Sequence, residues 1–273
     1  MMKYLPIAFI GAGNMTNAII SGMIQQGYPS ALITATNRSL PKLDALQARL
    51  KINVTQDNLQ AIQQAEVVVL AVKPQLMAEV CATFLKDGSL EGKSFISIAA
   101  GLDCQRIYTM LGANYPLVRT MPNTPSSLGV GLTGLFSDNA DAALRQFAEA
   151  VFNMVGTTVW ASTEAQINAV IAGAGSAPAY FYLFLEAMQN KVTELGFEPD
   201  AARAMVQQAM LGAAHMVIEN PALSLHDLRQ QVMSKGGTTA EAIAHFQAQN
   251  LEQIVGDAMQ AAVDRAEQMA KLL

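Results

Sequence analysis

The pattern of apolar and polar residues changes once along this chain, near residue 161. Before that point, short runs of consecutive apolar residues alternate with longer stretches in which apolar positions recur every three or four residues. Uninterrupted apolar runs are typical of strands covered on both faces, and the longer stretches are typical of amphipathic helices. The predicted strands are 7–10, 32–36, 67–72, 95–99, 118–119 and 157–160, and the predicted helices are 14–26, 39–50, 75–86 and 103–111.

This alternation predicts an α/β Rossmann domain, with a doubly wound and mostly parallel sheet, over residues 1–161. Residues 162–273 show only helical periodicity, in stretches near 163–191, 198–219, 224–233, 239–249 and 251–272. The second part of the chain is therefore predicted to be an all-helical domain.

Composition narrows the class of protein. The chain has 273 residues, enough for two modest cores, and 51% of them are hydrophobic while only 14% are charged. Globular proteins usually have about 25% charged residues, so we expect apolar surface to be covered in a homo-oligomer. A two-domain monomer that buries this surface internally is the alternative. A net charge of −5 without clusters of Lys or Arg argues against a nucleic-acid partner.

Three features of the sequence bear on the cellular compartment of the protein. Cys81 and Cys104 fall in predicted apolar helices without metal-ligand spacing, which favours buried thiols in a reducing compartment. The amino-terminus has the pattern of a strand and a glycine loop, not of a signal peptide. Residues 166–185 carry no charge, but Asn168, Gly173 and Pro178 interrupt them and no basic cluster flanks them. We predict a cytoplasmic protein with no membrane partner, in which this segment is a buried helix.

Gly11-Ala-Gly13-Asn-Met-Thr16 follows the first predicted strand and opens the first predicted helix. This is the context of a dinucleotide-binding loop, in which Gly11 permits a tight turn and Gly13 lets a diphosphate approach the helix start. Thr16 takes the place of the usual third glycine. A glycine turn without a ligand is the alternative interpretation.

The second predicted strand ends in Thr36-Asn37-Arg38-Ser39, and no acidic residue precedes Asp44. NAD-binding folds usually place an acidic residue here, on the ribose hydroxyls. A guanidinium and short polar groups suit a 2′-phosphate instead. We therefore predict NADPH as the cofactor, with NADH as the alternative. Arg38 could also be a solvated residue at a helix start that contacts no cofactor.

Two proline-containing loops follow strands on the same expected edge of the sheet. One is Ala71-Val72-Lys73-Pro74, and the other is Met121-Pro-Asn123-Thr-Pro125. Proline stiffens both loops, and Asn123 offers a carboxamide to ribose or nicotinamide. Stiff turns without a ligand would have the same composition.

Residues 234–241 read Ser-Lys-Gly-Gly-Thr-Thr-Ala-Glu. Thr238-x-x-Glu241 has the form of a capping box, which predicts Thr238 as the N-cap of a helix and leaves the hydroxyl of Thr239 free. The N–H groups of Gly237, Thr238 and Thr239 are then expected to point out of the helix end, where a carboxylate is favoured.

These motifs, together with Gly175-Ser-Ala-Pro-Ala-Tyr180, occur in an order that resembles the pyrroline-5-carboxylate reductase family over essentially the whole chain. The resemblance implies reduction of Δ1-pyrroline-5-carboxylate to L-proline with NAD(P)H, the last step of proline synthesis. It also implies a homodimer that assembles further to a decamer, with the active site near the dimer interface. Lys235 and Ala177 depart from the family's usual Ser-Pro-Gly-Gly and Gly-Ser-Gly-Pro sequences.

The residues and the resemblance together give two sets of site positions. The cofactor-binding positions are Gly11, Gly13, Asn14, Met15, Asn37, Arg38, Ser39, Asn58, Ala71, Val72, Lys73, Pro74 and Asn123. The substrate-binding positions are Val232, Gly237, Thr238 and Thr239, and the resemblance gives the hydroxyl of Thr239 a hydrogen bond to the ring nitrogen in catalysis. No metal is expected.

A protonated ring imine accepts hydride without a strong protein acid, and the motifs contain no His, Asp or Glu placed as a proton donor. His215, His226 and His245 lie in helical stretches and are predicted to be structural or solvated. Catalysis is thus expected to depend on positioning. Two alternatives remain: a non-catalytic NADPH-binding protein of the same fold, or a β-hydroxyacid-dehydrogenase-like oxidoreductase. The latter relies on a lysine in its first long helix of the second domain, and 165–190 contains none.

Overall fold

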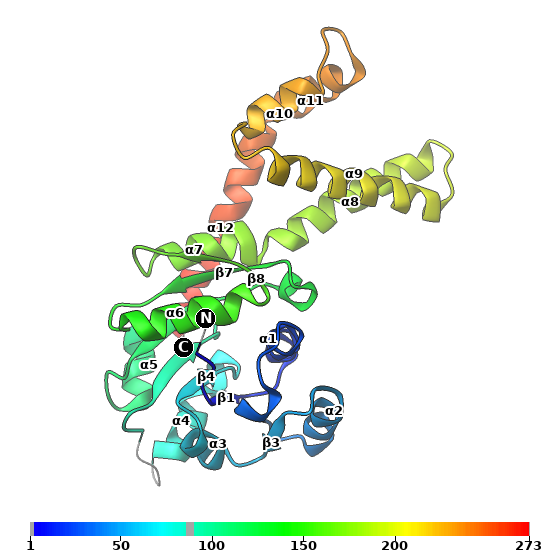
Figure 1. Cartoon of the computed structure of the whole chain (residues 1–273). Helices are drawn as coiled ribbons and strands as arrows, with labels where there is room; N and C mark the ends of the chain where they lie inside the picture. Colours follow the sequence, from blue (N-terminus) through cyan, green and yellow to red (C-terminus); the bar gives the residue numbers. More distant parts are fainter. Residues whose placement is uncertain (1–2, 86–89, 273) are drawn as a thin grey trace. The chain divides into compact units, whose positions relative to one another are not determined.

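The computed structural model describes residues 3–85 and 90–272, which form two compact units. The N-terminal unit comprises the residues up to Ser176 together with those from Ala262 onward, and the C-terminal unit comprises Ala177–Ala261. Figure 1 shows both units, with labels on most of their helices and several of their strands.

The N-terminal unit is built on an eight-stranded sheet of order β3-β2-β1-β4-β5-β6-β7-β8. All neighbours pair in parallel except β6 and β7, which are antiparallel. The Rossmann prediction is therefore confirmed. The strands are β1 (Ile7–Ile10), β2 (Ile33–Thr36), β3 (Asn53–Thr55), β4 (Val67–Leu70), β5 (Ser94–Ser97), β6 (Leu117–Met121), β7 (Gly131–Phe136) and β8 (Gly156–Trp160).

Helices connect these strands. The α-helices of this unit are α1 (Asn14–Gln25), α2 (Leu40–Leu50), α3 (Asn58–Gln64), α4 (Met77–Leu85), α5 (Cys104–Leu111), α6 (Ala142–Asn153) and α7 (Gln166–Val170). Short 3-10 turns are η1 (Ser30–Leu32), η2 (Pro74–Leu76) and η3 (Thr124–Leu128), and η4 (Ile171–Gly175) is a π-helical turn.

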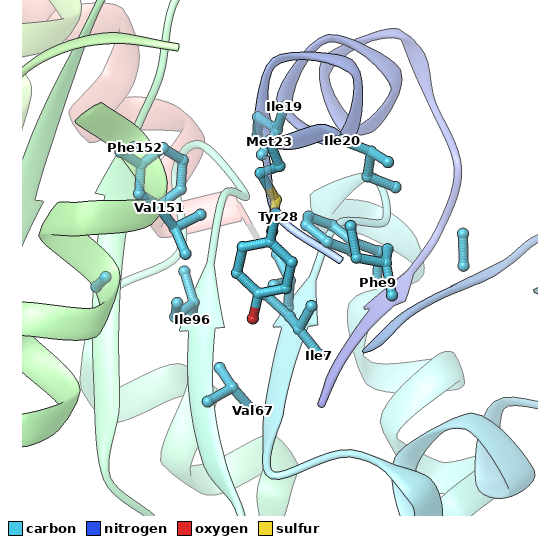
Figure 2. Packing of buried hydrophobic residues seen from close by; sticks show 14 of the residues in the cluster. Ile7, Phe9, Ile19, Ile20, Met23, Tyr28, Val67, Ile96, Val151 and Phe152 are labelled. Atoms are coloured by element: carbon cyan, nitrogen blue, oxygen red, sulfur yellow. The ribbon is translucent and has the colours of Figure 1, made fainter. Parts of the chain in front are cut away.

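The side chains of β1 alternate between two hydrophobic clusters. Ile7 and Phe9 belong to one cluster, and Ala8 and Ile10 to the other, because successive side chains of a strand point to opposite faces. Figure 2 shows part of the first cluster, in which Ile19, Ile20 and Met23 of α1 lie over the strands. Full burial of each such side chain contributes about 1.5–3 kcal/mol. This packing fixes the start of α1 at the carboxyl end of β1.

The helical segment after the sheet begins within the N-terminal unit. α7 packs on β6 and β7, and a Cβ on Gly134 of β7 would lie 2.8 Å from the side chain of Val170, so the glycine makes room for the helix. The division into compact units consequently falls after Ser176. The expected boundary at residues 161/162 lies instead just after β8, where the last strand ends, and stays a prediction.

The C-terminal unit is helical, as predicted. Its elements are α8 (Ala177–Glu194), α9 (Pro199–Glu219), α10 (Leu225–Gln231), α11 (Thr238–Ala248) and the first part of α12 (Leu251–Leu272). α8 and α9 pack together across a turn at Gly196, whose φ of +102° suits glycine.

One prediction for this region is wrong for the single chain. The segment 166–185 was expected to be a buried helix, but no residue of α8 is buried, and Phe181, Tyr182 and Leu183 are more than half exposed. Across the described residues, one helix, Gln166–Glu194, is long and apolar enough to cross a membrane by length and composition alone. Although α8 packs against α9, the side chains of Phe181, Tyr182 and Leu183 stay mostly exposed in the described part of the chain.

Candidate functional site

The glycine loop after β1 has a conformation that requires glycine at its first position. Gly11 has a φ of +108°, and a Cβ there would lie 2.8 Å from the carbonyl oxygen of Ala71. Thr16 is buried, and its hydroxyl donates a hydrogen bond of 2.7 Å to the carbonyl of Gly11. The residue at the third glycine position thus fastens the loop to α1.

The start of α1 is open to an anion. Gly13 is the N-cap, no side chain caps the helix, and nothing lies within 4 Å of the position that a Gly13 Cβ would occupy. The first N–H groups of a helix have no intrahelical acceptor, and the helix dipole favours negative charge there. The loop therefore fits the diphosphate of a dinucleotide.

Asn37 joins the glycine loop to the start of α2. Its side-chain nitrogen donates to the carbonyl of Ala12 at 3.1 Å, and its Oδ1 accepts from the N–H of Ser39 at 2.9 Å. Both ends of this carboxamide are engaged within the fold. Asn37 consequently fixes the glycine loop and the start of α2 relative to each other. Its predicted contact with the cofactor stays a prediction.

Arg38 already has an acidic partner. Its guanidinium lies 2.6 Å from Glu79 of α4, and the two side chains are 72% and 63% exposed. Ion pairs this exposed contribute about 0–1 kcal/mol, so a bound phosphate can displace the carboxylate at little cost. The predicted 2′-phosphate contact of Arg38 is compatible with this pair.

Asn58 is tied to the glycine loop through one hydroxyl group. Asn58 Oδ1 accepts a hydrogen bond of 2.7 Å from Thr36 Oγ1, which itself accepts from the N–H of Gly11 at 3.3 Å. This chain of bonds links the ends of three neighbouring strand connections. Asn58 therefore lies beside the glycine loop, and its predicted contact with the cofactor stays a prediction.

The two proline-containing loops differ in which of their polar groups are free to contact a ligand. The Ala71 N–H donates to Ile10 at 3.0 Å, which places Ala71 beside the glycine loop, and Lys73 is exposed. Asn123 is 8% exposed, donates to the carbonyl of Ala174 at 3.1 Å and accepts from the N–H of Leu132 at 2.9 Å. The carboxamide of Asn123 is thus used to fasten η3 and η4, and its predicted contact with ribose or nicotinamide stays a prediction.

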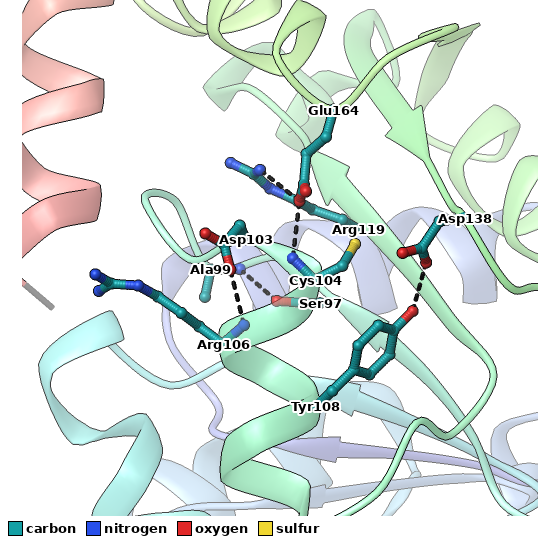
Figure 3. A network of polar contacts seen from close by, with 9 residues as sticks. All are labelled: Ser97, Ala99, Asp103, Cys104, Arg106, Tyr108, Arg119, Asp138 and Glu164. Atoms are coloured by element: carbon teal, nitrogen blue, oxygen red, sulfur yellow. Dashed lines mark hydrogen bonds and ion pairs between the residues drawn. The ribbon is translucent and has the colours of Figure 1, made fainter.

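A buried polar network that the sequence did not indicate lies at the start of α5 (Figure 3). Glu164 Oε1 accepts from Arg119 Nη1 at 2.8 Å and from the Cys104 N–H at 2.8 Å, and the Arg119 side chain is only 7% exposed. One carboxylate therefore neutralises a buried guanidinium of β6 and accepts a free N–H at the start of α5, whose N-cap is Asp103. No motif spacing connects residues 104, 119 and 164, so only the fold brings them together.

The cysteines are buried and free, as predicted. Burial raises the pKa of Cys81 to about 12 and raises the pKa of the Cys104 thiol as well. Both therefore stay protonated near neutral pH, which makes them poor nucleophiles. Across residues 3–85 and 90–272, no three His, Cys, Asp or Glu side chains cluster as metal ligands would.

The capping box predicted at Thr238 is wrong. α11 begins at Thr238 with Gly237 as its N-cap, and no side chain caps it. The N–H of Gly237 donates to the carbonyl of Ser234 at 2.9 Å, so this group is not free as expected. Glycine fits the N-cap well, and Gly236, with a φ of +70°, forms the turn before it. A true capping box lies elsewhere, between Ser224 and Asp227 at the start of α10.

The shift by one residue changes which groups face out of α11. The N–H groups of Thr238, Thr239 and Ala240 occupy the first helical turn, where no intrahelical acceptor exists. Thr239 is half-buried, and its hydroxyl has no partner among the described residues. The end of α11 thus presents three donors and one free hydroxyl, a set that suits a carboxylate with a polar atom beside it.

The remaining predicted residues around this helix end are solvent-facing in the single chain. Val232 is 67% exposed and Lys235 is exposed, without an ion pair in the described part of the chain. The three histidines of the helical region, His215, His226 and His245, are exposed as well. Nothing in the structure explains why lysine occupies position 235.

Comparison with known proteins covers both units. A family model described as pyrroline-5-carboxylate reductase dimerisation matches residues 164–269, and one described as NADP oxidoreductase coenzyme F420-dependent matches residues 6–101. The pyrroline-5-carboxylate reductase of Vibrio alginolyticus is 51% identical, and that of Haemophilus influenzae 46% identical, over 99% of this chain and 100% of each relative. The solved structure of a pyrroline-5-carboxylate reductase from Coxiella burnetii has a TM-score of 0.92 at 41% identity, and covers 98% of this chain and 99% of that one.

Proposed function

Because the chain belongs to the pyrroline-5-carboxylate reductase family, we propose that it reduces Δ1-pyrroline-5-carboxylate to L-proline with NADPH, the last step of proline biosynthesis. The structural observation that carries this proposal is the pair of uncapped helix starts, at α1 and at α11. One suits the diphosphate of the cofactor, and the other suits the carboxylate of the substrate.

When bound, NADPH supplies the hydride. The protein's own residues hold and orient the cofactor and the substrate. The N–H groups at the start of α1 hold the diphosphate, and those of Thr238, Thr239 and Ala240 hold the substrate carboxylate. The hydroxyl of Thr239 hydrogen-bonds the ring nitrogen and so orients the imine, while water delivers the proton. Because a protonated imine is already electrophilic, no strong protein acid is required. Orientation of the imine against the cofactor supplies most of the rate enhancement.

The exposed apolar side chains of α8 point to a second copy of the chain as their cover. Phe181, Tyr182 and Leu183 are 58–69% exposed in the single chain, and contiguous apolar surface of this kind marks an interaction site. The match to a dimerisation family over residues 164–269 supports a homodimer. We extend the proposal to further assembly into a decamer of a cytoplasmic enzyme, without contact to membrane or nucleic acid, and to the predicted division into domains at residues 161/162.

Activity with the proposed substrate tests the function directly. Purified protein is expected to oxidise NADPH when pyrroline-5-carboxylate is added, with proline as the product, and NADH is expected to be the poorer donor. Absorbance at the nicotinamide band together with proline quantification measures both. Binding of NADPH without turnover would indicate a non-catalytic NADPH-binding protein, whereas turnover with β-hydroxyacids would indicate the other dehydrogenase class.

The preference for NADPH is expected to depend on Arg38. Arg38→Ala should raise the KM for NADPH about fivefold, since one charge-assisted contact to a phosphate at an exposed site contributes about 1 kcal/mol, and should leave the KM for NADH within twofold. Glu79→Gln is the complementary variant: it releases Arg38 from its ion pair and should lower the KM for NADPH. An unchanged NADPH KM in Arg38→Ala would remove the residue from the cofactor site.

A further inference from the structure

The chain leaves the N-terminal unit at a break in a long helical segment. Helical residues run from Gln166 to Glu194, but η4 is a π-helical turn between the α-helices α7 and α8. The N–H of Ser176 donates to the carbonyl of Ile171, five residues before it, at 2.8 Å. The division between the two units follows directly after Ser176. Single π-helical turns inside helices often mark functional positions. This break, residues 171–178, is the joint between the units.

Pro178 deprives the joint of one backbone hydrogen bond. Proline has no N–H, so Pro178 cannot donate to the carbonyl of Ala174, four residues before it. That carbonyl accepts instead from Asn123 Nδ2 at 3.1 Å. A half-buried carbonyl without a donor would be unfavourable. Asn123 therefore takes the place of the missing backbone donor, from a loop that lies 51 residues earlier in the chain.

The sheet holds the other end of the Asn123 side chain. Asn123 Oδ1 accepts from the N–H of Leu132 in β7 at 2.9 Å, and the residue is buried. A second contact fixes the joint to the end of β6: a Cβ on Gly175 would lie 3.2 Å from Cε of Met121. The joint is thus fastened to the carboxyl end of β6 by a hydrogen bond and by packing.

The end of β6 lies at the edge of the sheet that the proposed function assigns to the cofactor. β6 runs parallel to β5, β4 and β1, so Asn123 follows a strand at the same edge as the glycine loop after β1. Thr238 and Thr239, which are proposed to hold the substrate, belong to the C-terminal unit. The other passage between the units, after Ala261, lies inside the uninterrupted helix α12. Hydride transfer therefore depends on a chain path whose irregular part is the joint.

We propose that Asn123 is a positioning residue of the reductase: by donating to the carbonyl that Pro178 leaves without a donor, it fixes the joint and keeps the cofactor and substrate sites in the arrangement that hydride transfer needs. This inference rests on the proposed function for the identity of the reaction. Both polar atoms of Asn123 bond to the protein itself, so its effect reaches the reaction through the joint. A misplacement of about 1 Å can lower a rate by about 10²-fold, which makes turnover the sensitive quantity.

Two variants of Asn123 and a matched control test this role. Asn123→Ala removes both hydrogen bonds of the side chain. Asn123→Asp, assayed at about pH 8, well above the ordinary carboxyl pKa of about 4, keeps an acceptor for Leu132 but has no N–H for Ala174. Ser137→Ala is the control, because Ser137 Oγ donates to a carbonyl at the start of β6 at 2.6 Å and accepts from the N–H of Ala140 at 2.8 Å. These are the same two kinds of bond at the opposite end of β6 and β7.

Both Asn123 variants are expected to lower kcat about tenfold, with the KM and the Kd for NADPH within twofold of wild type. Ser137→Ala is expected to lower the melting temperature to a similar extent and to keep kcat within twofold. Steady-state kinetics well below the melting temperature, calorimetry with NADPH and thermal unfolding measure these quantities. Near-normal kcat in Asn123→Asp, or an equal loss of kcat in Ser137→Ala, would overturn the proposal. Weakened NADPH binding would also overturn it, because Asn123 would then be a cofactor contact.

Hydrogen exchange tests the joint without any turnover. Peptides that cover residues 171–178 should exchange faster in both Asn123 variants than in wild type, and at the wild-type rate in Ser137→Ala. Unchanged exchange in the Asn123 variants would overturn the proposal.

The outcome is separable from that of the proposed function. Turnover of pyrroline-5-carboxylate by wild type, with the same kcat in both Asn123 variants, would refute only the role of Asn123. NADPH binding without turnover by wild type would refute the reductase and with it the positioning role, while faster exchange in the Asn123 variants would still establish the hydrogen bond that holds the joint.

Discussion

Replacing Thr239 with alanine is expected to lower the turnover number more than tenfold, equivalent to about 1.4 kcal/mol or more of barrier, without loss of the fold. Thr239 occupies the first turn of α11, and its hydroxyl has no partner within the described residues. Its removal therefore breaks no hydrogen bond within the described part of the chain. What it removes is the proposed hydrogen bond to the substrate nitrogen. Steady-state kinetics with NADPH and pyrroline-5-carboxylate measure the effect.

Two variants at the same position separate the hydroxyl from the shape of the side chain. Thr239→Ser retains the hydroxyl and should keep most of the turnover, whereas Thr239→Val keeps the shape and should resemble Thr239→Ala. Circular dichroism and thermal unfolding verify that all three remain folded. Near-normal turnover in Thr239→Val would exclude the assigned role.

Replacing Glu164 with alanine should lower the free energy of unfolding by about 2–4 kcal/mol, because it leaves a buried guanidinium without its counter-charge. The Arg119 side chain is 7% exposed, and Glu164 lies 2.8 Å from it. The same change removes the acceptor of the Cys104 N–H at the start of α5, which adds an unsatisfied donor. Urea denaturation followed by tryptophan fluorescence and circular dichroism measures the loss.

The matched control is an exposed ion pair. Glu194→Ala breaks the pair with Lys191, whose side chains are 65% and 67% exposed, and should cost less than about 1 kcal/mol. The double variant Arg119→Met/Glu164→Met should regain part of the stability lost in Glu164→Ala, because no buried charge remains. If Glu164→Ala costs no more than Glu194→Ala, the Arg119 pair is not the stabilising contact described above.

The fold followed from the sequence wherever apolar runs were long enough to indicate burial on both faces. β1, β2, β4 and β5 were predicted within two residues at each end. Two strands were not predicted for physical reasons. β3 has only three residues, none of them buried, so it has no apolar run to detect. β7 contains Gly131 and Gly134, which weaken the strand pattern but are needed where Ser126 and α7 approach its backbone.

Site residues could be predicted from the sequence where the local backbone accepts only one residue type. Gly11 illustrates this, since its positive φ and its contact with Ala71 leave no room for a side chain. The cap of α11 was misplaced because Thr238 and Gly237 are both acceptable N-caps, and only the backbone decides between them. Glu164 could not be found, because its partners are separated from it by 45 and 60 residues and meet only in the folded sheet.

The two hydrogen bonds of Asn37 have a consequence for protein engineering. One side chain braces the loop after β1 and the first residue before α2, so the loop predicted to hold the diphosphate and the segment predicted to hold the 2′-phosphate are linked to each other. We therefore expect that a redesign of the cofactor preference can change the exposed Arg38 without loss of the fold, provided that Asn37 is retained to hold the two loops in place.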